Sequence, residues 1–150
     1  MKEKEKSGML KKAIENWLIN TNERNYLPAF CQILLNEGKE IIYISQHGEM
    51  EQGKDIIAID RKGRCYAYQL KTGVINLNVW RKIRGEIEEL TRFPPIHPSI
   101  DKRKIHKSFL VTNRYVTDSV RIQIDQMNED NRLKRRKYSC LLYTSPSPRD

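Results

Sequence analysis

Residues 53–73, GKDIIAIDRKGRCYAYQLKTG, decide the fold. Two short apolar runs flank a charged turn, which is the pattern of two strands joined as a β-hairpin. Apolar side chains fall on both faces of each run, as central strands between two layers of helices require. Yet the first run begins with Asp55, and the second ends with Gln69 and Lys71. These three polar groups interrupt strands that are otherwise apolar, so they are candidates for chemistry.

The length of the turn decides whether the three groups converge. A two-residue turn would pair Asp55 with Leu70 and place the carboxylate on the face away from Gln69. A three-residue turn at 61–63 has Gly63 at the left-handed position and pairs Asp55 with Gln69. Directly opposed Cβ atoms lie about 4.5–5.5 Å apart. A bulge just before the aspartate would achieve the same convergence.

The rest of the chain alternates helical and strand patterns. Apolar residues recur at helical spacing in four segments, which predict helices near 10–18, over 28–36, from 76 onward and from 117 onward. Short apolar runs at 40–45 and 107–112 predict two more strands. The order is helix, helix, three strands, helix, strand, helix. It predicts an α/β domain with a mixed sheet flanked by helices on both faces.

Composition limits the class of protein. The chain has 150 residues and fits one domain over 1–140, with a helical N-terminal part at 1–25. The net charge of +9 favours a polyanionic partner, most often nucleic acid. Three widely spaced cysteines without a C-x-x-C pair indicate neither a disulfide framework nor a zinc ribbon. No secretory signal or membrane-length apolar run is visible, so we expect a cytoplasmic protein without a membrane partner.

The last ten residues, LLYTSPSPRD, have a different character. They follow a basic run, repeat Ser-Pro and show no periodicity. They resemble the translated sequencing-adapter tail found at the ends of metagenomic gene fragments. We therefore expect 141–150 to be a non-native or disordered tail and the domain to be truncated near Cys140. A natural disordered tail is the alternative.

An aspartate, an amide and a lysine in one place suit hydrolysis of a phosphodiester. The carboxylate of Asp55 and the amide oxygen of Gln69 are hard ligands of the kind Mg²⁺ prefers, and Mn²⁺ would substitute. The ammonium of Lys71 would orient or help deprotonate an attacking water and stabilise charge in the transition state. The alternative interpretation is an Asp–Lys pair at the edge of a surface hairpin, with the amide solvated.

These residues resemble a known family. G-x-D, a hairpin and Q-x-K are similar to the PD-(D/E)xK nuclease superfamily, in the variant typical of Mrr-like restriction endonucleases. The resemblance covers 26–130 and includes FCQILLNEG, EIIYIS, GKD with YQLK, and LVTN. It implies a restriction-endonuclease-like fold and a metal-dependent endonuclease that acts on DNA, often in defence. By this resemblance Asp55 is the metal carboxylate, Gln69 takes the D/E position, and Lys71 is the catalytic lysine.

One departure concerns the second carboxylate. Many relatives carry a glutamate directly after a helix phenylalanine, but here Phe30 is followed by Cys31. Glu51, shortly before the GKD motif, is the preferred substitute and counts among the predicted catalytic residues. A solvated loop glutamate is an equally good interpretation of Glu51, and Glu15 is an alternative ligand that would require convergence in the tertiary structure. His47 would contact phosphate or transfer a proton if it is not simply a surface residue.

Basic residues supply the expected contacts to nucleic acid. Those with a plausible position on the hairpin and the following helix are Lys54, Arg61, Lys62, Arg81 and Lys82. Such charges bind phosphates without reading bases. No recognition helix is identifiable, so specificity would require a homodimer or a fused or partner recognition domain. A catalytically inactive nucleic-acid-binding module of the same fold is the rival hypothesis, and RNA is an alternative substrate.

Overall fold

The computed structural model describes residues 23–44, 54–100, 105–137 and 139–144, and the predicted helix at 10–18 lies outside them. The helices are α2 (Glu23–Asn36), α3 (Leu77–Arg92) and α4 (Asp118–Leu133). The strands are β1 (Glu40–Ile44), β2 (Ile56–Ile59), β3 (Cys65–Lys71), β4 (Lys107–Thr112) and β5 (Cys140–Thr144). The predicted strands, and the helices after Asn76 and Thr117, are therefore present.

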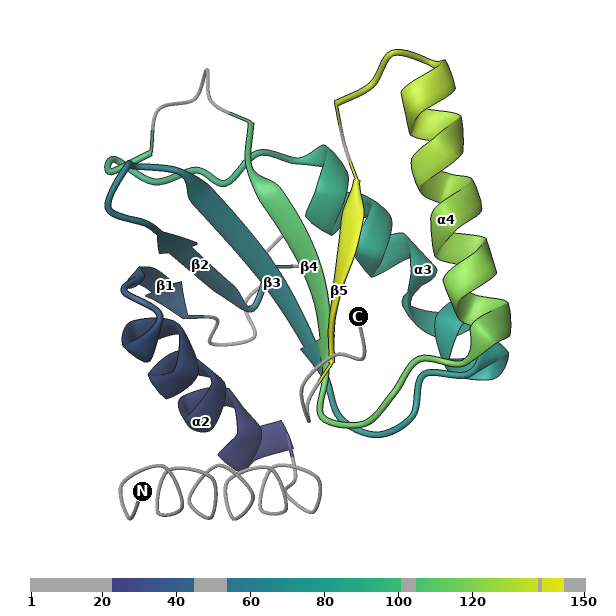
Figure 1. The fold of residues 1–150 in the computed structure, drawn as a ribbon, viewed down its shortest axis with the longest axis horizontal. Coiled ribbons are helices and arrows are strands. Elements are labelled where there is room, and N and C mark those ends of the chain that lie inside the picture. Colours follow the sequence, from purple (N-terminus) through teal and green to yellow (C-terminus); the bar gives the residue numbers. More distant parts are fainter. Residues whose placement is uncertain (1–22, 45–53, 101–104, 138, 145–150) are drawn as a thin grey trace, which may run out of the picture.

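The described strands form one mixed sheet in the order β1-β2-β3-β4-β5 (Figure 1). The first three strands are antiparallel neighbours joined along the chain. β4 then pairs parallel to β3, and β5 pairs parallel to β4. Parallel neighbours need a crossover connection, and α3 and α4 supply the two crossovers. The prediction of an α/β domain with a mixed sheet is confirmed.

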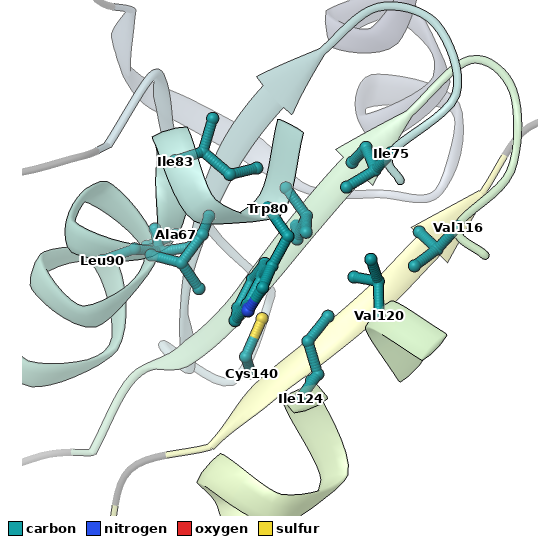
Figure 2. Packing of buried hydrophobic residues seen from close by; sticks show 11 residues of the cluster. Ala67, Ile75, Trp80, Ile83, Leu90, Val116, Val120, Ile124 and Cys140 are labelled. Atoms are coloured by element: carbon teal, nitrogen blue, oxygen red, sulfur yellow. The ribbon is translucent and has the colours of Figure 1, made fainter. Parts of the chain in front are cut away.

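Helices cover both faces of the sheet. On one face, Tyr26, Phe30 and Leu34 of α2 pack against side chains of β2, β3 and β4. On the other face, α3 and α4 pack against Ala67 of β3 and Leu110 of β4. Figure 2 shows part of this second cluster, including residues of α3, α4 and β5. β2 and β3 are buried along almost their whole length, as their sequences predict.

α2 begins earlier than predicted. Its first residue is Glu23, and Pro28 lies inside the helix rather than at its first turn. The reason is Tyr26, which is fully buried one turn before Phe30, with the centroids of the two rings 6.1 Å apart. This buried pair extends the apolar face of the helix past the proline. The predicted end is confirmed, because Gly38 has a φ of 85° and its N–H bonds to a carbonyl of the last turn.

β5 includes the first residues of the predicted tail. Its residues from Leu141 to Thr144 pair with β4, whereas 145–150 lie outside the described residues. Cys140 is buried under α4, and its backbone exchanges two hydrogen bonds with the side chain of Asn128, at 2.9 and 2.8 Å. The sequence interpretation missed this strand because the whole apolar run was assigned to a non-native segment. Across the described residues, no helix has the length and apolar character required to cross a membrane.

Candidate active site

The turn between β2 and β3 contains three residues. Asp60 and Arg64 are joined by a backbone hydrogen bond of 3.0 Å, and Gly63 has a φ of 76°. The ladder continues from Ile59 opposite Cys65. The carboxylate of Asp60 accepts the backbone N–H groups of Lys62 and Arg64, both at 2.9 Å, and holds the turn closed. The three-residue alternative is therefore confirmed, and the two-residue alternative is wrong.

Asp55 lies at the start of β2, beside the backbone of β3. Its N–H donates to the carbonyl of Tyr68 at 2.8 Å, and its carboxylate accepts the N–H of Leu70 at 2.8 Å. These partners flank Gln69 on both sides. The last ladder pair is Ile56 with Tyr68, so the predicted pairing of Asp55 with Gln69 is not part of the ladder, and Asp55 is held beside β3 by its bonds to Tyr68 and Leu70 instead. The aspartate is fixed by the strand that carries the other two polar groups.

Gln69 and Lys71 meet a third side chain, that of Glu86 in α3. Oε2 of Glu86 lies 2.7 Å from Nζ of Lys71 and accepts a longer hydrogen bond, 3.4 Å, from Nε2 of Gln69. Two residues apart on β3, the amide and the ammonium point to the same face of the sheet. The buried residues Ile83 and Ile87 of α3 pack the helix onto this face and so place Glu86 over the pair.

The side-chain amide oxygen of Gln69 is a hydrogen-bond acceptor that receives no donor from the described residues. The residue is only 6% exposed, and among the described residues no donor bonds to Oε1. A buried amide oxygen without a partner carries a desolvation cost, which a bound cation or a water would remove. Asp55, Gln69 and Glu86 supply carboxylate and amide oxygens, the donor set of Mg²⁺. The chemical type of these oxygens fits the predicted cofactor, but Oε2 of Glu86 already contacts Nζ of Lys71 and Nε2 of Gln69, and the described residues contain no group of three His, Cys, Asp or Glu arranged around a metal position.

Sequence reasoning missed Glu86. The helix carries Glu86, Glu88 and Glu89 within one turn, and nothing in the sequence distinguishes the first. Only the packing of α3 on the sheet selects it. Glu86 is 49% exposed at its side chain, so it borders solvent while reaching Lys71. The preferred candidate, Glu51, lies outside the described residues and remains a prediction, as does His47.

The five predicted nucleic-acid contacts fall into two groups. Arg61 and Lys62 are exposed in the turn, and Arg81 and Lys82 are exposed on α3. Lys54 differs, because it is 2% exposed and its ammonium donates to the backbone carbonyl of Glu89 at 3.4 Å. A contact from this lysine to phosphate would require the side chain to leave its position. The apolar run that follows Lys54 gave no signal that the lysine itself is buried.

Burial also changes the ionisation of Lys54. It lowers the pKa of the ammonium to about 8, and the carboxylate of Glu89 and the thiol of Cys65 act in the opposite direction. Cys65 is buried as well, and its burial raises the pKa of its thiol to about 11, so this thiol stays protonated at neutral pH. Cys31, Cys65 and Cys140 are all buried free thiols.

Comparisons of the chain with protein-family models, with curated proteins and with solved structures found no match.

Proposed function

We propose that this chain is a Mg²⁺-dependent endonuclease domain with a restriction-endonuclease-like fold, which hydrolyses phosphodiester bonds in DNA. The observation that carries the proposal is the meeting of Gln69, Lys71 and Glu86 beside the backbone-bonded Asp55. The element order supports it, because helix, three antiparallel strands, helix and parallel strand follow the segments that resemble Mrr-like nucleases. The same resemblance suggests a role in restriction or defence against foreign DNA.

Each side chain has a role in this reaction. Asp55, Gln69 and Glu86 would hold Mg²⁺, with Mn²⁺ as a substitute, and the cation would neutralise charge on the phosphodiester when bound. Lys71 would donate to the developing negative charge, or orient the attacking water, from a position that its ion pair with Glu86 maintains. The exposed Arg61, Lys62, Arg81 and Lys82 would contact the DNA backbone.

The test is cleavage of supercoiled plasmid by the 150-residue chain with Mg²⁺ or Mn²⁺. Wild type should nick the plasmid, and chelation should stop the reaction. Lys71→Ala should lose the activity because the charge in the site is removed. Lys137→Ala is the matched control, an exposed lysine outside the site. Equal cleavage by wild type and Lys71→Ala would remove Lys71 from the mechanism.

A catalytically inactive binding module is the second candidate. It is favoured by one observation: Phe30 is followed by the buried Cys31 rather than by a glutamate. The carboxylate that meets Lys71 is Glu86, and it is engaged in an ion pair. Binding of DNA that weakens with salt, without cleavage in Mg²⁺ or Mn²⁺, would select this candidate. Parallel assays with RNA of matched length would decide the substrate class.

A further inference from the structure

The C-terminal end of α3 is held by side chains from several parts of the chain. The carbonyl of Leu90 accepts Nε2 of His106 at 3.0 Å and Oγ of Ser108 at 3.2 Å. The carbonyl of Glu89 accepts Nζ of Lys54 and the N–H of Phe93. The last carbonyls of a helix lack partners within the helix and carry partial negative charge, so these donors stabilise it. The end of α3 is thus anchored to the sheet.

Lys54 is the contact that joins this anchored end to the candidate site. Asp55 follows it directly in the chain, and Glu89 comes one turn after Glu86 in the helix. A hydrogen bond from Lys54 to Glu89 therefore connects the start of β2 to the helix that supplies the second carboxylate. Asp55 in turn joins the start of β2 to β3, because its N–H donates to Tyr68 and its carboxylate accepts the N–H of Leu70.

A lysine is a costly choice at this position. Burying an ammonium costs more than burying an apolar side chain of similar length, such as methionine. Packing alone would therefore favour an apolar residue here. Lys54 is nevertheless among the largest fully buried side chains of the described residues. What the lysine adds is a directed hydrogen bond to a helix end, made by the residue next to Asp55.

We propose that Lys54 is a positioning residue, which fixes Asp55 relative to α3, the helix that carries Glu86, by tying the start of β2 to the end of that helix. The inference rests on the proposed function for its consequence in catalysis, but the tie itself can be measured without activity. It replaces the expectation that Lys54 contacts DNA. The Lys54→Met variant removes the donor and keeps the length of the side chain, and Lys54→Arg keeps a cationic donor.

Amide hydrogen exchange at Leu70 reports whether the hydrogen bond from Lys54 to Glu89 holds Asp55 in place. The N–H of Leu70 donates to the carboxylate of Asp55, and the N–H of Arg64 donates to that of Asp60 at the far end of the hairpin. In Lys54→Met, exchange at Leu70 should accelerate by about tenfold or more, while exchange at Arg64 stays unchanged. Lys54→Arg should restore most of the protection. Unchanged protection at Leu70, or an equal loss at both amides, would overturn the inference.

Cleavage separates positioning from DNA binding. A displaced Asp55 should slow single-turnover cleavage by about 10²-fold and leave the Kd for DNA and its salt dependence unchanged. Removal of a phosphate-binding charge would instead weaken DNA binding, and the slope of log K against log salt concentration would fall by about one. Lys62→Met, in the exposed turn, is the matched control for charge. Weaker binding with an unaltered single-turnover rate would overturn positioning.

The two proposals fail in different ways. If wild type does not cleave, but Leu70 loses protection in Lys54→Met, the endonuclease function fails and the tie stands. If wild type cleaves and Lys54→Met cleaves at the same rate, the endonuclease function stands and the positioning role fails. If Lys54→Met does not fold, the comparison uses Lys54→Arg and Lys54→Gln, which retain a donor of different reach. Lys54→Arg should then keep most of the protection and Lys54→Gln should lose it, and Leu70 protection and cleavage in Lys54→Gln equal to wild type would contradict positioning.

Discussion

Glu86 of α3 lies 2.7 Å from the ammonium of Lys71 on β3, and the same carboxylate oxygen accepts the amide of Gln69. The candidate site is therefore assembled across the connection between β3 and β4, not within the hairpin alone. The helix that makes the parallel crossover also supplies a charged group to the strand that it covers.

Substitution of Glu86 tests its part in the site. Glu86→Gln should reduce plasmid cleavage by at least about tenfold and weaken Mn²⁺ binding, because a carboxylate ligand and the partner of Lys71 are lost. The melting temperature should change by less than about 3 °C, since half-exposed ion pairs contribute little to stability. Glu88→Gln, an exposed glutamate in the same helix that pairs with Arg84, is the control. Wild-type Mn²⁺ affinity in Glu86→Gln would argue against a ligand role.

Two glycines should respond in opposite directions to alanine. Gly63 has a φ of 76°, so Gly63→Ala should destabilise the chain by about 1 kcal/mol, because a Cβ is strained in the left-handed region. Gly85 lies within α3, and a Cβ there would meet no other group within 4 Å, so Gly85→Ala should stabilise by about 0.5–1 kcal/mol. Urea unfolding measures both. A neutral Gly63→Ala would mean that the turn relaxes without cost.

His106 should make the fold sensitive to mild acid. Burial lowers its pKa below the ordinary value of 6.5; the hydrogen bond to Leu90 raises it, and the nearby charge of Lys54 lowers it. The unfolded chain then binds a proton before the folded chain does, so stability should fall as the pH drops below about 6.5. His106→Gln, which keeps a donor for Leu90, should flatten this dependence. Parallel curves of unfolding free energy between pH 7 and 5 for both proteins would contradict the assignment.

The exposed basic residues of α3 should govern binding to DNA without affecting the fold. The double variant Arg81→Ala and Lys82→Ala should weaken binding at about 0.1 M salt, and the slope of log K against log salt should fall by about 0.9 for each phosphate that these side chains neutralise. Arg132→Ala is the control, because this arginine pairs with Glu129 in α4. Fluorescence anisotropy across a salt series measures the slope. An identical slope in wild type and the double variant would exclude this face of the helix.

Much of the fold followed from local patterns. The apolar runs of β2 and β3, the helical spacing after Asn76 and the left-handed Gly63 are signals within a few residues, and each predicted its element. The start of α2 did not follow, since the burial of Tyr26 depends on the sheet beneath it. β5 was missed because its apolar run was assigned to the non-native tail, and only its pairing with β4, far away in the sequence, identifies it as a strand.

The candidate site also divides into residues that local sequence reveals and residues that only tertiary packing reveals. Asp55, Gln69 and Lys71 were visible because polar side chains in apolar strands stand out, and the turn length could be reasoned from one glycine. Glu86 was not singled out, and Lys54 was predicted as a contact to DNA rather than as a buried residue. Their roles arise from how α3 packs on the sheet, and neither charge clustering nor spacing along the chain encodes that packing.

The turn at 61–63 has a consequence for how this sequence can evolve. The side chains of a strand alternate, so removing or adding one residue here would move every partner of β2 to the other face of the sheet. Surface turns ordinarily tolerate such changes in length. Here substitutions at Arg61 and Lys62 should leave the fold intact even where they weaken DNA binding, but insertions or deletions should be accepted only in pairs. Among related chains, the length of this turn should therefore vary less than its residues.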